Sequence, residues 1–211
     1  MAILDAIFTR LCLRVIEMVN GLGVILAGGK ATRLDGISKA NILIGDQTCL
    51  MRAQRVLAQG LNDIAVSGKV ETHLKTLSDW PDEERGGVAL AVLGALDWAQ
   101  KCGYNFIITL PVDTPFVPLN FTHDLNAEFK KNTCSVTFRN SERVQGLHAL
   151  WPVTCLDELK VLILEQGICK IEMLHEKLGS RYVHFLDEDH DPFFNLNTQA
   201  DIETAHSLIK V

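Results

Sequence analysis

A glycine pair followed by two cations is the part of this sequence best suited to chemistry. Gly28 and Gly29 end an apolar run, and Arg33 and Lys39 follow them closely. Glycines carry no Cβ, so their backbone N–H groups can approach phosphate oxygens, and nearby cations neutralise the phosphate charge. The segment therefore predicts a polyphosphate site in a nucleotide-handling enzyme. The other reading is an ordinary strand-to-helix turn with both cations in solvent.

A second candidate is an aspartate that follows another apolar run. Residues 106–110 read Phe-Ile-Ile-Thr-Leu, Asp113 comes three residues later, and Pro115 and Pro118 stop the run from continuing. If both runs are parallel strands, Asp113 stands at the same sheet edge as the glycine pair. Mg²⁺ takes one or two carboxylates together with substrate phosphates, so Asp113 is predicted to be a Mg²⁺ ligand. A simpler role, capping the following turn, stays open.

These residues must be positioned by alternating strands and helices. The apolar patterns predict strands over residues 22–27, 62–67, 104–110, 134–138, 147–151 and 181–185. They predict helices over residues 50–59, 88–101, 121–131, 154–164, 170–178 and 198–209. This alternation favours an α/β fold: one domain, a three-layer sandwich with a mostly parallel sheet and helices on both faces. We expect that domain to span residues 21–211.

Composition excludes several other classes of protein. The chain has 211 residues, 47% of them hydrophobic, which is enough for one substantial core. Its net charge is −6 and no Lys/Arg run exceeds two residues, so we expect neither a nucleic-acid partner nor a membrane partner. The six cysteines form no C-x-x-C pair, which indicates buried, unpaired thiols in a reducing compartment, the cytoplasm.

The first twenty residues form a separate extension. Their apolar residues are spaced like one face of a helix. Asp5, however, lies where a signal peptide would be basic, Arg10 and Arg14 interrupt the apolar run, and no small-residue cleavage site follows. The segment is therefore predicted to be neither a signal peptide nor a membrane span. It is interpreted as an accessory helix or as an artefact of the assigned start, since Met18 lies just before the first strand.

The glycine segment matches neither standard phosphate motif. G-x-x-x-x-G-K-[ST] is absent, and G-x-G-x-x-G fails because Lys-Ala-Thr-Arg follows the glycine pair. Three segments together resemble the molybdenum cofactor guanylyltransferase (MobA) family, over residues 21–209. They are Leu-Ala-Gly-Gly at 26–29 with its two cations, Pro-Val-Asp-Thr-Pro-Phe at 111–116, and Asp-Pro-Phe-Phe-Asn-Leu-Asn-Thr at 191–198.

The resemblance implies a Rossmann-like nucleotidyltransferase fold and a Mg²⁺-dependent reaction. In that reaction GTP and a molybdopterin-type cofactor give the guanine dinucleotide cofactor and pyrophosphate. It also suggests transient contact with cofactor-biosynthesis proteins or molybdoenzymes. By this resemblance, GTP would be bound by the glycine segment, Leu26, Ala27, Gly28 and Gly29. Lys39 and Arg33 would hold the phosphates, and Asp113 would carry Mg²⁺. Asn195 and Asn197 would lie on the pterin-phosphate side. Lys39, Asp113 and Arg33 are the predicted catalytic residues.

The chain departs from the family pattern where the base should be recognised. Asp35 replaces a glycine, Lys69 falls at an asparagine position, and Lys75 falls at an aspartate position, with Asp79 or Asp82 as substitutes. Gly-Val-Ala-Leu-Ala at 87–91 replaces Gly-Pro-Leu-Ala-Gly, and Gln-Gly at 145–146 replaces His-Pro. Two alternatives therefore stay open. One is a transferase for another base or acceptor, such as CTP or a sugar phosphate. The other is a diverged, catalytically weak paralogue that binds nucleotide.

Overall fold

The computed structural model describes residues 20–28, 33–34, 37–81, 87–129, 135–139, 143–185 and 191–209. At positions 33, 34 and 37 it describes the backbone alone. Several predictions lie outside the described residues: the extension over residues 1–20 apart from Asn20, the site residue Gly29, the side chain of Arg33, and Asp35, Asp82, Cys12 and Cys134.

A seven-stranded sheet forms the middle layer of the molecule. Its strands are β1 Gly21–Leu26, β6 Asp63–Ser67, β7 Lys75–Leu77, β8 Phe106–Pro111, β9 Val136–Arg139, β10 Val144–Pro152 and β11 Arg181–His184. They lie in the order β11-β9-β10-β8-β1-β6-β7. Within this sheet β10 alone is antiparallel to its neighbours, so the predicted mostly parallel sheet is confirmed.

Helices cover both faces of the sheet, which confirms the predicted three layers. Successive β1 residues point to opposite faces, so Val24 joins one buried cluster and Ile25 the other. The first face is covered by α3 Val88–Lys101, α5 Leu156–Lys160 and α6 Ile171–Lys177. The second is covered by α2 Cys49–Leu57 and α4 Phe121–Glu128.

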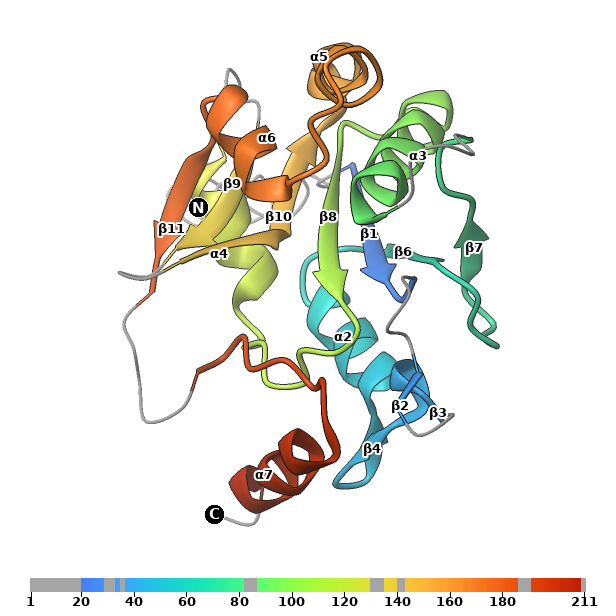
Figure 1. The fold of residues 1–211 in the computed structure, drawn as a ribbon, viewed down its shortest axis with the longest axis vertical. Helices are drawn as coiled ribbons and strands as arrows, with labels where there is room; N and C mark the ends of the chain where they lie inside the picture. The colour runs from blue at the N-terminus through green and yellow to red at the C-terminus, as the bar shows by residue number, and fades with distance from the viewer. Residues whose placement is uncertain are drawn as a thin grey trace, which may run out of the picture.

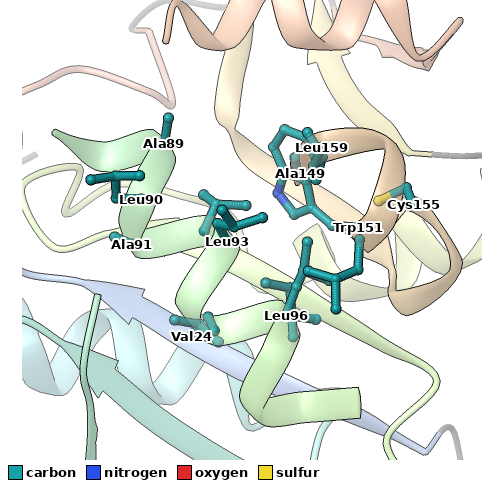
Figure 2. Packing of buried hydrophobic residues seen from close by; sticks show 14 of the residues in the cluster. Val24, Ala89, Leu90, Ala91, Leu93, Leu96, Ala149, Trp151, Cys155 and Leu159 are labelled. Carbon is teal, nitrogen blue, oxygen red and sulfur yellow. The ribbon is translucent and has the colours of Figure 1, made fainter. Parts of the chain in front are cut away.

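The buried indole of Trp151 on β10 joins three elements of the first face. Figure 2 shows Leu93 and Leu96 of α3 and Leu159 of α5 gathered around Trp151. Its Nε1–H donates to Thr109 Oγ1 on β8 at 3.0 Å, so the buried indole leaves no donor unsatisfied. This packing holds α3 firmly against the strands whose ends carry the site.

Smaller elements lie beyond the carboxyl ends of β1 and β8. They are β2 Arg33–Leu34, β3 Ile37–Ser38, the short 3₁₀ helix η1 Lys39–Asn41, β4 Leu43–Ile44, β5 Gln47–Thr48 and α7 Gln199–Ile209. In Figure 1 the arrowheads of β1 and β8 point towards β2–β4 and α7. The first and last parts of the described chain therefore meet at this edge of the sheet.

The predicted elements agree with the structure in type and order, with several differences. The predicted helix over 121–131 ends at Glu128, and the short elements between residues 33 and 48 were not predicted. The edge strand β7 was not predicted, because only Leu77 of its three residues is buried and no apolar run marks it. β10 begins at Val144, three residues before the predicted start. The predicted helix over 154–164 ends in a π-helical segment, Val161–Glu165.

Two further expectations concern the burial of the cysteine thiols and the absence of a membrane partner. Cys49 and Cys155 are buried, but Cys102 and Cys169 are exposed, so the prediction of buried thiols is wrong for these two. None of the described helices has the length and the apolar character needed to cross a membrane.

Candidate active site

A cavity of about 620 Å³ opens at the carboxyl ends of β1 and β8. The structure brings most of the predicted site residues to its wall: Leu26, Ala27, Gly28, Lys39, Asp113 and Asn195. Topology explains this, because β1 and β8 are parallel neighbours and their carboxyl ends share one edge.

The glycine segment is held from both sides by neighbouring strands. Ala27 N donates to Ser67 O at 2.8 Å, and Val112 N donates to Leu26 O at 3.1 Å. The turn after β6 comes very close, since a Cβ on Gly68 would lie 2.6 Å from Ala27 C, and Gly68 has a φ of 127°. Only glycine fits this approach and this backbone conformation. The backbone that faces the cavity is thus fixed before any ligand arrives.

Lys39 is the central cation of the cavity. It is only 5% exposed, and its Nζ donates to Asp113 Oδ2 at 2.9 Å and to Asn197 Oδ1 at 2.8 Å. Helix η1 delivers the lysine from one end of the chain, and the segment before α7 delivers the asparagine from the other. A phosphate in the cavity would therefore meet a preorganised ammonium group.

The segment that carries both asparagines is docked directly onto the Asp113 turn. Leu196 N donates to Asp113 O at 2.9 Å, which places Asn195 at the cavity wall and Asn197 beside Lys39. Asp201 caps the start of α7 by accepting from Asn197 N and Thr198 N. Hydrogen bonds from these backbone groups, first that of Asn197, lower the pKa of the Asp201 carboxyl.

The donors around Lys39 suit a hard divalent cation that shares its shell with phosphates. Asp113 Oδ2 and Asn197 Oδ1 converge on one positive group, so the two oxygens can face a single cation. In the described part of the chain no three His, Cys, Asp or Glu side chains form a metal cluster. This sparse oxygen set fits Mg²⁺, which keeps several waters and takes few protein ligands, better than a metal that needs a full protein cage.

A smaller cavity of about 70 Å³ extends the site past the glycine segment. It shares Leu26, Gly28 and Val88 with the main cavity and is also lined by Ser67 and Asp79. Ser67 Oγ donates to Asp79 Oδ1 at 2.9 Å, which orients the carboxylate at this cavity.

Lys69 and Lys75, matched by sequence to family nucleotide positions, line neither of these two cavities. Lys75 Nζ instead lies 6.0 Å from the Trp98 ring centre. Of the two predicted substitutes, Asp79 reaches the site, and Asp82 lies outside the described residues.

The opposite wall of the main cavity is an irregular stretch of β10. The pairing of β10 with β9 shifts register between Gln145 and Ala149, so residues 146–148 bulge from the ladder. The cavity is lined there by Arg143, Gln145, Gly146, Leu147 and His148, and by Glu172 of α6. Sequence reasoning missed this wall. The Gln-Gly pair in place of His-Pro was the one signal that pointed to it.

Two titratable groups near the site are held neutral. Burial, with a smaller contribution from Arg143, lowers the pKa of His148 to about 3, and its Nε2 lies 3.0 Å from Thr114 Oγ1. Burial, and next the Asp113 carboxylate, raise the pKa of the Cys49 thiol to about 12. Neither group can serve as a charged catalyst near neutral pH.

Comparison with known proteins adds a family match over most of the chain. Residues 23–179 match the family model of the MobA-like NTP transferase domain. A molybdenum cofactor guanylyltransferase from Acidiphilium cryptum is 32% identical over 190 residues, which cover 87% of this chain and 93% of that protein. One from Cereibacter sphaeroides is 30% identical over 191 residues, covering 89% of this chain and 96% of that protein.

Solved structures with lower identity share the fold. The molybdopterin-guanine dinucleotide biosynthesis protein A from Archaeoglobus fulgidus superposes with a TM-score of 0.70 at 20% identity, covering 90% of this chain and 98% of that one. A 4-diphosphocytidyl-2C-methyl-D-erythritol synthase from Anaerococcus prevotii gives 0.67 at 13% identity, covering 93% and 100%.

Proposed function

The chain belongs to the MobA-like NTP transferase family, and from this premise we propose that it transfers GMP from GTP to a molybdopterin-type cofactor. The observation that carries the proposal is the cluster of Lys39, Asp113 and Asn197. It lies between a glycine segment suited to phosphates and a polar wall suited to an acceptor. The names of the relatives supply the acceptor and the base.

The transfer makes one phosphorus–oxygen bond and breaks another. An oxygen of the acceptor phosphate attacks the α-phosphorus of GTP, and the bond from that phosphorus to the bridging oxygen breaks. Pyrophosphate leaves, and the acceptor becomes a guanine dinucleotide with a new phosphoanhydride link. The protein aligns the reactants and offsets charge, which is where most of the rate enhancement of such transfers arises.

Lys39 offsets the charge of the reacting phosphates. Its ammonium is desolvated, and a phosphate that displaces the Asn197 or Asp113 oxygen gains a strong, charge-assisted hydrogen bond. Asp113 and Asn197 would hold Mg²⁺, which when bound neutralises the triphosphate and the leaving pyrophosphate. Gly29 and the Arg33 side chain stay proposed contributors to triphosphate binding, on the family resemblance.

Asp79 is the proposed reader of guanine. A carboxylate accepts from both the ring N–H and the 2-amino group of guanine, and cytosine presents no such pair of donors. Ser67 orients this carboxylate at the far end of the cavity from β10. This carboxylate favours GTP over CTP as the donor.

A nucleotide panel tests the proposal. Pyrophosphate release would be measured for GTP, ITP, CTP and ATP, with molybdopterin as acceptor and with or without Mg²⁺. We expect release with GTP, and about tenfold less efficient release with ITP, which lacks the 2-amino group. Asp79→Asn should remove the preference for GTP over ITP, whereas Asp157→Asn, at an exposed position of α5, should retain it.

Other outcomes of the panel would select the remaining readings. Release with CTP, or with a sugar phosphate as acceptor, would replace the guanylyl assignment. Folded protein that binds GTP and releases no pyrophosphate with any acceptor would identify a nucleotide-binding paralogue. We place the enzyme in the cytoplasm, where GTP is available, and retain transient contact with cofactor-biosynthesis proteins or molybdoenzymes as part of the proposal.

A further inference from the structure

The amide of Gln145 is an unsatisfied hydrogen-bond donor in the wall of the main cavity. The residue is 8% exposed, and its Nε2 is buried with no hydrogen-bond partner in the described structure. Buried donors are nearly always paired, since an unpaired one keeps its full desolvation cost. Because Gln145 also lines the main cavity, a ligand that enters this cavity and displaces the side chain slightly can supply the missing acceptor.

The backbone around Gln145 is built to hold this position. Each backbone carbonyl of the β10 bulge accepts a hydrogen bond from a buried side chain. Thr137 Oγ1 shares its single proton between Gln145 O at 2.9 Å and His148 O at 3.2 Å, and Thr109 Oγ1 donates to Leu147 O at 2.7 Å. The bulge is therefore a rigid feature with a network of its own.

His175 of α6 completes this network. Its Nε2 lies 2.8 Å from Gly146 O, which can only accept, so Nε2 carries the proton. Burial lowers the pKa of His175 to about 4, so the ring is neutral and its Nδ1 accepts from a serine hydroxyl, with Ser180 Oγ at 2.8 Å and Ser135 Oγ at 3.1 Å. Every carbonyl from Gln145 to His148 thus has a partner, while the Gln145 amide nitrogen has none.

Helix α6 brings a carboxylate to the same wall. Ile171 packs so closely on Gly146 that a Cβ there would lie 2.6 Å from Ile171 Cγ2. The next residue, Glu172, lines the cavity. Apart from Asp113, Glu172 is the only carboxylate among the described lining residues.

The position of this wall assigns it to the acceptor. The glycine segment and Asp79 lie at the ends of β1, β6 and β7, and Asp113 follows β8. β10 is next to β8 on the other side, so a molecule that meets the α-phosphate beside Asp113 extends over β10.

We propose that Gln145 and Glu172 recognise the 2-amino-4-oxopyrimidine edge of the pterin acceptor, an inference that rests on the proposed function. The Gln145 amide donates to the ring carbonyl, and the Glu172 carboxylate accepts from the ring N–H and the 2-amino group. This pairing satisfies the one orphaned donor and makes a charge-assisted, two-point contact. A ring that has a second carbonyl in place of the amino group would place an acceptor opposite the Glu172 carboxylate, which is also an acceptor. Such a ring should therefore bind poorly.

Two fluorescent probes test the role of Glu172. Pterin-6-carboxylate carries the 2-amino group, and lumazine-6-carboxylate has a carbonyl there. Both would be titrated against protein saturated with a GTP analogue that has a methylene α–β bridge, so that the base subsite is occupied. The native protein should bind the pterin at least about tenfold more tightly than the lumazine. Glu172→Gln should abolish the preference, and Glu176→Gln, one turn further along α6 and exposed, should retain it.

Equal binding of the two probes to the native protein would overturn the proposal. So would a preference that survives in Glu172→Gln. If Glu172→Gln instead weakens binding of the GTP analogue, the wall serves the base and not the acceptor, and the proposal fails as well.

Gln145→Leu separates recognition from a structural role. The substitution removes the orphaned donor and keeps the bulk, so the melting temperature should stay constant or rise. Pterin binding should weaken about three- to tenfold. A lower melting temperature with unchanged pterin binding would show that Gln145 only supports the fold, which contradicts the proposal.

Pyrophosphate release keeps this inference distinct from the proposed function. If the native protein shows no GTP-dependent release with molybdopterin, the proposed function fails. If release occurs and neither Gln145→Leu nor Glu172→Gln changes the KM for molybdopterin, the function stands and this inference alone fails.

Discussion

Lys39 shows how single residues from distant parts of the chain make this site. Its ammonium is almost fully buried, and it is shared between a carboxylate 74 positions away and an amide 158 positions away. A buried ammonium without partners would be strongly disfavoured, so each of the three groups depends on the others. Removing one of them should affect charge compensation more than shape.

Asp113→Asn tests this dependence at the residue scale. The variant keeps the size of the side chain but loses the charge that pairs with Lys39 and would hold Mg²⁺. We expect pyrophosphate release to fall about 10²- to 10³-fold, as for loss of one charge-stabilising group. GTP binding without Mg²⁺, measured by titration, should change little.

An exposed aspartate supplies the control for that experiment. Asp46 lies in the turn between β4 and β5, away from the lining of the cavity, so Asp46→Asn should leave release unchanged. Release by folded Asp113→Asn within tenfold of the native level would contradict a catalytic role for Asp113.

At the scale of elements, the crossing of α3 by the segment after β7 positions the base end of the site. Trp80 N donates to Leu90 O at 2.9 Å, and a Cβ on Gly94 would lie 2.5 Å from Ser78 O and 2.7 Å from Trp80 N. The segment after β7 can approach the backbone of α3 this closely only because Gly94 has no side chain. Asp79 lies within the segment, so its position follows from the crossing.

Gly94→Ala should therefore reverse the usual effect of this substitution. In an exposed helix interior alanine is favoured over glycine by about 1 kcal/mol. Here the added Cβ must push backbone away, so we expect the free energy of unfolding to fall by about 1 to 3 kcal/mol in urea denaturation. The KM for GTP should rise as Asp79 moves. The exposed change Gln100→Ala in the same helix should be near neutral, and a more stable Gly94→Ala would refute the close crossing.

At the scale of the whole molecule, two buried neutral histidines link stability to pH. The pKa of His148 is lowered to about 3 and that of His175 to about 4, against about 6.5 in an unfolded chain. Below pH 6.5 these two histidines bind protons in the unfolded chain but stay neutral in the folded chain. Stability is therefore fully present above that pH and is lost as the pH falls towards 4.

Urea denaturation at pH 7.5 and pH 5.0 measures this linkage. The two histidines together should lower the free energy of unfolding by about 3 to 4 kcal/mol between these pH values. His148→Gln should remove about half of the difference, and His123→Gln, at an exposed position, should remove none. An equal pH dependence in the native protein and in His148→Gln would contradict the burial of a neutral imidazole at position 148.

Much of the fold was predictable because it depends on local patterns. Alternation of apolar residues and the long apolar helix over 88–101 were visible in the sequence, and α3 has these bounds. The strand β7 was not visible, since its pairing with β6 and not its own composition makes it a strand. The antiparallel direction of β10 likewise depends on partners far away in the chain.

The candidate site was likewise predictable only in part from the sequence. The sequence by itself determined that a glycine segment, a cation and a carboxylate lie at one sheet edge, because short-range spacing and strand polarity are enough for this. Only the tertiary structure decided that Asp79, and not Lys75, lines the smaller cavity, and that Lys39 lies between Asp113 and Asn197.

The tertiary structure also decided that a bulge holding Gln145 lines the main cavity. Three elements, β8, β9 and α6, must converge on that bulge to satisfy its carbonyls. Such convergence is a property of long-range packing, which no local pattern encodes.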